Sequence, residues 1–261
     1  MSEEYLAFAK QLALDSGKIM LEYFGKASGH YKEDNTIVTE ADTKINQLLI
    51  GRVREKYPEH GVYGEEDSFG KDRNELWVCD PLDGTLAFSN GIPVATFSLA
   101  YVVDGKPVLG VICDPFTNRL YSAVKGGGAF CNNEPIHVDD FDLADKRSTT
   151  NFVLPPKMPY DISKAIYELM RIRARVNGIP TVVGQGALVA RGASTASIVA
   201  SGRAYDVASV EIIVEEAGGK VTNLLGEEQR YDGPIRGAII SNGKVHDELV
   251  AISKANVKEN R

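Results

Sequence analysis

The sequence of 261 residues contains only three cysteines, Cys79, Cys113 and Cys131, and they lie far apart. They form no C-x-x-C pair, which argues against a disulfide framework or a zinc site and favours buried thiols in a reducing compartment. No apolar run is long enough to cross a bilayer, because the longest, residues 92–103, is interrupted by proline and polar residues. The acidic N-terminal residues do not form a signal peptide. We therefore expect a cytoplasmic protein with no membrane partner.

Positive charge is also scarce in this chain. Lys and Arg number 29 against 36 Asp and Glu, which gives a formal net charge of −7. A chain this acidic lacks the basic surface of a nucleic-acid-binding protein, so no nucleic-acid partner is expected. Hydrophobic residues make up 43% of the chain, which is enough for a sizeable core and excludes a disordered protein. If the protein binds an anion, something other than its net charge must attract it.

Hydrophobic spacing divides the chain into two halves. In residues 1–145 it predicts helices at 6–24 and 39–57, a hairpin of strands at 94–103 and 108–113, and a third antiparallel strand at 119–124. The proline-containing stretch 141–160 predicts a boundary. In residues 146–261, helical patterns at 162–176, 207–217 and 245–253 alternate with strand-like runs at 181–183, 220–222 and 237–240. The order predicts an α+β half followed by an α/β half, packed closely together.

The most informative stretch is W-V-C-D-P-L-D-G-T at residues 77–85. An apolar strand is expected to end at Asp80, with Asp83 following in one turn. The two carboxylates and the Leu82 carbonyl would form an oxygen-rich site for a hard divalent cation. The N–H groups of Gly84 and Thr85 would face an anion if they open a helix. A solvated Asp-rich turn explains the same spacing equally well.

Three further acidic positions have ordinary structural explanations when each is taken alone. Asp42 ends a T-x-x-D pattern, which a helix capping box explains fully. Glu65 begins a run of three acids, and such runs are most often solvated loops. Asp206 precedes a helical pattern and would serve as an N-cap.

Taken together, these segments follow one ordered pattern. T-x-x-D is followed by G-E-E, W-x-x-D-P-x-D-G-T, a glycine-rich G-G-G-A-F, and Y-D-x-A-x-x-x-I-x-x-E-A-G-G. The pattern covers nearly the whole chain and resembles the inositol monophosphatase family, the Mg²⁺-dependent, lithium-sensitive phosphatases of sugars and polyols. The resemblance implies a layered αβαβα sandwich of the sugar-phosphatase type, a small phosphorylated substrate and, commonly, a homodimer.

The resemblance also implies a role for each matching residue. Glu65, Asp80 and the Leu82 carbonyl would hold one Mg²⁺, while Asp80, Asp83 and Asp206 would hold a second, with a looser third near Glu65. Asp42 and Thr85 would orient and deprotonate the attacking water, and the N–H groups of Gly84 and Thr85 would bind phosphate.

The charge of the chain is consistent with these implied roles. The five acids account for −5 of the net charge of −7. Their convergence without cations would raise their own pKa values. Two or three Mg²⁺ ions would instead offset this charge and attract a phosphate dianion, with a metal-activated water as nucleophile.

The sequence departs from the family pattern at two places. Ala87 and Asn90 stand where the family usually has Asn and His, which predicts altered loop packing or substrate preference. After a helix expected at residues 192–196, the family has a further strand that carries an acidic substrate contact. Here residues 201–204 run straight into Tyr205 and Asp206. About ten residues, one strand and its turn, are therefore predicted to be absent, and without them Asp206 would not be carried to the other acids.

The sequence thus predicts a Mg²⁺-dependent phosphate monoester hydrolase acting on a small polyol or sugar phosphate. Relatives specific for histidinol phosphate, fructose bisphosphate or 3′-phosphonucleotides are alternatives within the same class. A degenerate phosphatase scaffold that binds metal or phosphate with little or no turnover is the alternative from another class, and the shortened segment before Asp206 favours it. The third interpretation is an acidic α/β domain in which each of these acids either caps a helix or lies in a solvated loop.

Overall fold

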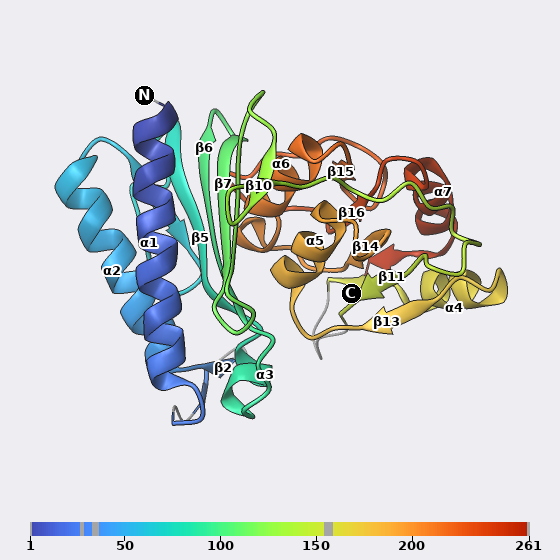
Figure 1. Ribbon diagram of the computed structural model, residues 1–261, viewed down its shortest axis with the longest axis horizontal. Coiled ribbons are helices and arrows are strands. Elements are labelled where there is room, and N and C mark those ends of the chain that lie inside the picture. The colour runs from blue at the N-terminus through green and yellow to red at the C-terminus, as the bar shows by residue number, and fades with distance from the viewer. Residues whose placement is uncertain (1, 27–28, 33–36, 154–158, 260–261) are drawn as a thin grey trace.

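The chain folds into five alternating layers of helices and sheets (Figure 1). The computed structural model describes residues 2–26, 29–32, 37–153 and 159–259. Helices α1 and α2 cover one face of the first sheet, α5 and α6 fill the space between the two sheets, and α4 and α7 cover the outer face of the second sheet. The predicted αβαβα sandwich is therefore confirmed. The seven α-helices of the described residues are α1 (Ser2–Tyr23), α2 (Glu40–Lys56), α3 (Thr85–Ser89), α4 (Ser163–Arg171), α5 (Val182–Ala190), α6 (Ala208–Glu216) and α7 (His246–Asn256).

The first sheet has eight strands in the order β10-β9-β8-β7-β6-β5-β3-β4. All neighbouring pairs are antiparallel except β3 and β5, which run parallel. The hairpin and third strand predicted from the sequence correspond to β6, β7 and β8. The strands are β3 (Gly61–Gly64), β4 (Ser68–Phe69), β5 (Glu75–Asp83), β6 (Thr96–Val103), β7 (Lys106–Asp114), β8 (Arg119–Val124), β9 (Ala129–Cys131) and β10 (Glu134–Pro135).

The second sheet has five strands in the order β13-β11-β14-β16-β15. Strand β14 lies at its centre, parallel to β11 and antiparallel to β16. The strands are β11 (Thr150–Phe152), β13 (Val176–Gly178), β14 (Ala196–Val199), β15 (Lys220–Thr222) and β16 (Ala238–Ser241). Two small ribbons pair β1 (His30–Tyr31) with β2 (Ile37–Val38) and β12 (Tyr160–Asp161) with β17 (Lys258–Glu259).

Strand β14 corrects the prediction that a strand is missing before Asp206. The segment expected as a helix at residues 192–196 is a turn that leads into β14. The preceding helix is α5, and its first residues are the run at 181–183 that the sequence analysis assigned to a strand. The order of helix, strand and acid is thus complete in this chain. A 3₁₀ turn, η1 (Ala204–Asp206), follows β14 and carries Asp206.

Side chains of both halves share the largest hydrophobic core. This cluster includes Val78 and Ile112 from the first sheet, Val210 and Ile213 from α6, and Ile240 from the second sheet. Because α6 packs on both sheets, the two halves are joined by buried apolar contacts.

The boundary between the two halves at residues 145 and 146 stays a prediction. Among the described helices, none combines the length and the hydropathy that crossing a membrane requires.

Candidate metal centre

Asp80 and Asp83 both lie within strand β5, so the strand does not end at Asp80 as predicted. Asp80 pairs with Ser98 and Asp83 with Thr96 on the neighbouring strand β6, and the register is irregular between them. Proline has no N–H to donate to a partner strand. Pro81 is tolerated here because the hydrogen-bond ladder is interrupted at this irregularity. The Leu82 N–H donates to Asp80 Oδ1 at 2.9 Å. The two carboxylates and the Leu82 carbonyl therefore come from one short piece of chain, as predicted.

The Asp83 carboxylate is bound by the first turn of helix α5. Its oxygens accept from the N–H groups of Val182 and Val183, both at 3.0 Å, and from the Thr181 hydroxyl. The Thr96 hydroxyl donates to the same carboxylate at 3.2 Å. An acidic group at a helix N-terminus satisfies N–H groups that have no partner within the helix. Asp83 thus joins the first sheet to the middle helical layer.

Asp42 combines the two roles that the sequence suggested for it. Its carboxylate accepts from the backbone N–H and the hydroxyl of Thr39, which forms the capping box of helix α2. The other oxygen, Oδ1, lies 3.3 Å from the Thr85 hydroxyl, which also donates to the Leu82 carbonyl at 2.9 Å. Asp42 is fully buried. The capping interaction therefore does not exclude Asp42 from the candidate site but places it beside Thr85.

Glu65 and Asp206 approach the same place from opposite halves of the chain. Glu65 directly follows β3, and its N–H donates to the Cys79 carbonyl at 3.2 Å, beside Asp80. Its carboxylate accepts from Arg203 Nη1 at 3.0 Å. Asp206 accepts a hydrogen bond from the Ser201 hydroxyl. Strand β14 and the 3₁₀ turn thus carry Asp206 to the first sheet, contrary to the prediction that it would fall short.

Burial and mutual repulsion raise the pKa values of these acids. Burial is the larger cause at each: it raises the pKa of Glu65 to about 8, with Asp206 adding to the effect, and the pKa of Asp206 to about 7, with Asp83 adding. The pKa of Asp80 is raised by burial and then by Glu65, Asp83 and Asp206. Burial likewise raises the pKa of Asp42 to about 6. Glu65, Asp80, Asp83 and Asp206 therefore form one electrostatic cluster with an excess of negative charge.

Each carboxylate of this cluster is nevertheless engaged by a protein group. Within the described ranges, no three His, Cys, Asp or Glu side chains are arranged to hold a metal ion as they stand. Arg203 contacts Glu65, Ser201 contacts Asp206, and the start of α5 contacts Asp83. The donor set is nonetheless made only of carboxylate and carbonyl oxygens, which suit a hard divalent cation. Buried acids with raised pKa values also fit such a cation, because its charge would offset theirs.

Gly84 makes the turn from β5 into helix α3. Its φ of 91° lies in the left-handed region, where glycine is unstrained. A Cβ at this position would lie 3.1 Å from the Pro180 carbonyl oxygen. Thr85 opens the helix, as the sequence analysis anticipated, although α3 has only five residues. The assignment of the Gly84 and Thr85 N–H groups to phosphate stays a prediction.

The sequence analysis did not identify a group of aromatic and cationic side chains beside the acids. We call Tyr63, Lys71, Arg203 and Tyr205 the rim. The Tyr63 and Tyr205 rings meet edge to face with centroids 5.9 Å apart. Lys71 Nζ lies 3.9 Å from the Tyr63 ring centroid, and Arg203 Cζ lies 6.0 Å from that of Tyr205. The signal that was available is Arg203 itself, a basic residue three positions before Asp206.

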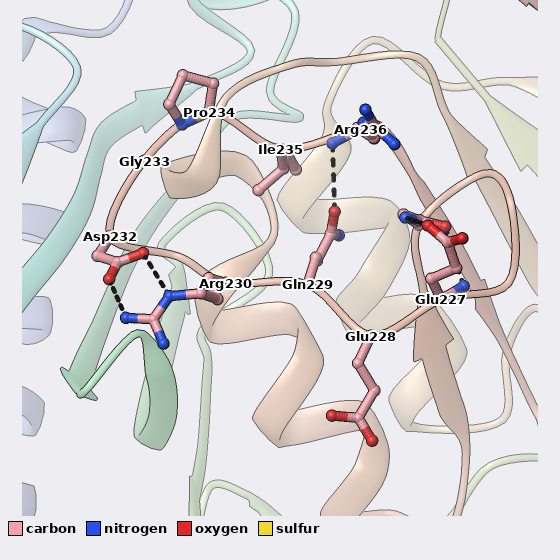
Figure 2. Close-up of a pocket in the computed structure, with 10 residues that line it drawn as sticks. Glu227, Glu228, Gln229, Arg230, Asp232, Gly233, Pro234, Ile235 and Arg236 are labelled. Carbon is pink, nitrogen blue, oxygen red and sulfur yellow. Dashed lines mark hydrogen bonds and ion pairs between the residues drawn. The ribbon is translucent and has the colours of Figure 1, made fainter.

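A separate surface pocket of about 430 Å³ lies in the loop of residues 223–236 (Figure 2). Three of its acids are engaged by protein groups: Arg230 contacts Asp232, Asn223 donates to Glu227 at 3.1 Å, and Lys106 pairs with Glu228 at 2.9 Å. None of the acids of the candidate site lines this pocket. The loop does touch the segment before Asp206, because the Ile235 N–H donates to the Gly202 carbonyl at 2.9 Å. We therefore assign the chemistry to the acidic cluster and not to this pocket.

Comparison with known proteins agrees with the family resemblance of the sequence. The profile of the Inositol monophosphatase family matches residues 1–258 of the chain. A histidinol-phosphatase of Chlorobaculum parvum is 33% identical over 256 residues, which span 94% of this chain and 95% of the relative. A fructose-1,6-bisphosphatase/inositol-1-monophosphatase of Thermotoga maritima is 33% identical over 262 residues and 97% of each protein. The solved structure of an IMPase of Thermotoga maritima superposes with a TM-score of 0.86 at 29% identity over 97% of each chain.

Proposed function

Since the chain belongs to the inositol monophosphatase family, we propose that it is a Mg²⁺-dependent phosphatase of a small polyol or sugar phosphate. Its class is that of a phosphoric monoester hydrolase. The observation that carries the proposal is the convergence of Glu65, Asp80, Asp83 and Asp206 from distant parts of the chain. Burial and their mutual repulsion raise the pKa values of Glu65 and Asp80.

Excess negative charge at a buried site has a physical cost that a cation would offset. We assign Glu65, Asp80 and the Leu82 carbonyl to one Mg²⁺, and Asp80, Asp83 and Asp206 to a second. The number of ions, two or three, belongs to the proposal. Bound Mg²⁺ would supply charge for the phosphate oxygens and lower the pKa of a water molecule.

Residues of the chain would orient the attacking water molecule and accept its proton. Asp42 Oδ1 lies 3.3 Å from the Thr85 hydroxyl, so the two groups can hold one water molecule between them. The Asp42 carboxylate would accept the proton of that water, since its pKa of about 6 leaves it mostly ionised at neutral pH. The N–H groups of Gly84 and Thr85 would hold phosphate oxygens. No side chain needs to act as a covalent nucleophile.

The proposed substrate class follows from the sequence resemblance and from the names of relatives. The names of relatives include histidinol-phosphatase and fructose-1,6-bisphosphatase/inositol-1-monophosphatase. Histidinol phosphate and fructose bisphosphate are therefore retained beside inositol monophosphate. 3′-Phosphonucleotides are kept as the alternative that the sequence resemblance offers. The homodimer and the cytoplasmic location implied earlier stay predictions, and sedimentation of the purified protein would test the first.

A second function is favoured by one observation. In the described part of the chain, the acids are engaged by protein groups and do not form a closed metal-binding set. A degenerate scaffold that binds metal or phosphate with little or no turnover fits this arrangement. Calorimetric titration with Mg²⁺ distinguishes the two functions, because metal binding without phosphate release supports the scaffold and binding with release supports the enzyme.

The decisive experiment is phosphate release from a panel of sugar and polyol phosphates with and without Mg²⁺. We expect release that requires Mg²⁺ and that Asp80→Asn reduces by at least about 1000-fold, equivalent to roughly 4 kcal/mol of transition-state stabilisation. Asp247→Asn is the matched control, because Asp247 is an exposed acid on helix α7. Absence of release from every substrate at every Mg²⁺ concentration would exclude the catalytic proposal.

A further inference from the structure

The segment between strand β14 and the 3₁₀ turn carries a cation at the edge of the acidic cluster. Residues 200–203 form this connection, and Arg203 is its last member. Arg203 Nη1 lies 3.0 Å from Glu65 Oε1, one of the carboxylates assigned to the metal. The Arg203 side chain is 40% exposed, whereas that of Glu65 is only 11% exposed. Arg203 therefore stands between the buried acids and solvent.

The surroundings of Arg203 make it the inner end of the rim. Its guanidinium lies over the Tyr205 ring, Tyr205 contacts Tyr63, and Lys71 covers the Tyr63 ring. Aromatic faces stabilise a cation at such distances and limit the conformations of its side chain. The half-buried Tyr63 ring also offers apolar surface to the carbon skeleton of a ligand, whereas Tyr205 is buried and supports Tyr63 from the core. The rim thus combines a defined cation with a surface suited to a small organic molecule.

The charge of Glu65 cannot fully balance two cations. When this carboxylate ligates a metal ion, as proposed above, the guanidinium shares it with that ion and the net charge beside Arg203 becomes more positive. Arg presents a planar fork of N–H donors that matches carboxylate and phosphate oxygens. An acidic residue at this place would favour the hydroxyl groups of a neutral polyol, whereas Arg203 favours an anion.

We infer that Arg203 is a specificity-determining residue that binds a second anionic group, a carboxylate or a second phosphate, on the phosphate ester. The inference rests on the proposed function and deepens it, because it names the substrate class as phosphomonoesters with another negative charge. Phosphates of polyols that carry no second anionic group are then the poorer substrates. The apolar part of the ligand lies against Tyr63.

The test compares two pairs of substrates that differ mainly in the second anion. 2-Phosphoglycerate is paired with glycerol 2-phosphate, and fructose 1,6-bisphosphate with fructose 1-phosphate, so that the first pair tests a carboxylate and the second a phosphate. For at least one pair, we expect the wild-type protein to have a kcat/KM about tenfold higher for the more anionic member, as one charge-assisted hydrogen bond provides. Arg203→Gln should abolish this preference by raising KM for that member with little change in kcat. Arg203→Lys, which keeps the charge and loses the fork, should retain part of the preference.

Arg171→Gln is the matched control, because Arg171 pairs with Glu168 on helix α4, on the outer side of the second sheet (Figure 1). It should leave the preference unchanged. Equal substrate use by the wild-type protein, or an equal loss for both members of each pair in Arg203→Gln, would overturn the inference, since the residue would then only position Glu65.

Direct binding separates failure of this inference from failure of the proposed function. Calorimetric titrations of 2-phosphoglycerate and glycerol 2-phosphate, and of the fructose pair, with Ca²⁺ in place of Mg²⁺, do not depend on turnover. We expect the more anionic member of at least one pair to bind about tenfold more tightly to wild type than to Arg203→Gln. Its counterpart, which lacks the second anionic group, should bind both proteins alike. If no substrate releases phosphate but this difference is measured, the catalytic proposal fails and the role of Arg203 stands. If phosphate is released but the proteins show no such difference in binding, the catalytic proposal stands and the role of Arg203 fails.

Discussion

Glu211 on helix α6 provides a test of how burial acts on an acid that lies outside the candidate metal centre. Its carboxylate accepts a hydrogen bond from the hydroxyl of Tyr231, a fully buried tyrosine. Burial raises the pKa of Glu211 from the ordinary 4.5 to about 7, the Tyr231 hydrogen bond opposes the rise, and Glu215 adds to it. The folded protein therefore binds a proton here more tightly than the unfolded chain does. This contribution to stability is complete below about pH 4.5 and is lost as the pH rises through 7.

The magnitude follows from the two pKa values. A difference from 4.5 to about 7 corresponds to roughly 3 kcal/mol at about 1.36 kcal/mol per pH unit, of which about 2.5 kcal/mol is lost between pH 5 and pH 8. Glu211→Gln keeps an acceptor for the Tyr231 hydroxyl and does not ionise. The free energy of unfolding of the variant relative to wild type should therefore increase by about 2.5 kcal/mol from pH 5 to pH 8.

The assay is urea denaturation of both proteins in EDTA at pH 5, 6.5 and 8, followed by far-UV circular dichroism. Glu248→Gln on helix α7 is the control, since Glu248 is an exposed glutamate and its replacement should shift stability equally at each pH. A difference between Glu211→Gln and wild type that does not change with pH would refute the argument, because the carboxylate would then be ionised in the folded protein throughout the range.

Three further outcomes are expected. In thermal denaturation, Mg²⁺ at 100 times its Kd should raise the free energy of unfolding of wild type by about 2.7 kcal/mol and leave that of Asp80→Asn unchanged. Equal stabilisation of both proteins would contradict the assignment of Asp80 to the metal. Thr181→Val should lower the free energy of unfolding by about 1–2 kcal/mol in urea, because the Thr181 hydroxyl accepts from the Gly184 N–H at 3.0 Å and donates to Asp83; a change near zero would show that this cap is dispensable. Burial lowers the pKa of His246 to about 4, so the contribution of His246 to stability should fall as the pH drops below 6.5, by about 2.5 kcal/mol at pH 4.5. His246→Gln should remove this loss, and a difference in the free energy of unfolding between wild type and variant that stays constant across that range would argue against it.

The elements with strong periodic patterns were predicted correctly from the sequence. Helix α2 begins after Thr39 and ends at Lys56, and strands β6 to β8 form the predicted antiparallel set. The errors fall where tertiary contacts decide the structure. Residues 181–183 contain two valines and suggest a strand, but they begin helix α5 because the Asp83 carboxylate, distant in the sequence, accepts from their N–H groups. No local pattern contains that information.

The prediction of a missing strand had a similar cause. Strand β14 is only four residues long, and its first two residues, Ala196 and Ser197, do not favour strands, so only Ile198 and Val199 give a local signal. Its neighbours in the sheet, β11 and β16, come from distant segments and supply the hydrogen bonds that make it a strand. Once α5 is recognised as the helix before it, the distance from β14 to Asp206 needs no deletion. The acids of the site were identifiable because their spacing forms an ordered motif.

The position of Arg203 links the two halves of the molecule at the acidic cluster. Glu65, Asp80 and Asp83 belong to the first sheet or follow it directly, whereas Asp206 comes from the second half. Repulsion between these acids therefore acts across the contact between the halves. The buried apolar core around α6 opposes this repulsion, and the Arg203–Glu65 ion pair offsets part of it. A divalent cation shared by Asp80 and Asp206 would do the same more strongly, because it places two positive charges where the repulsion is greatest. Under the proposed function, metal affinity and cohesion of the two halves would thus depend on the same carboxylates.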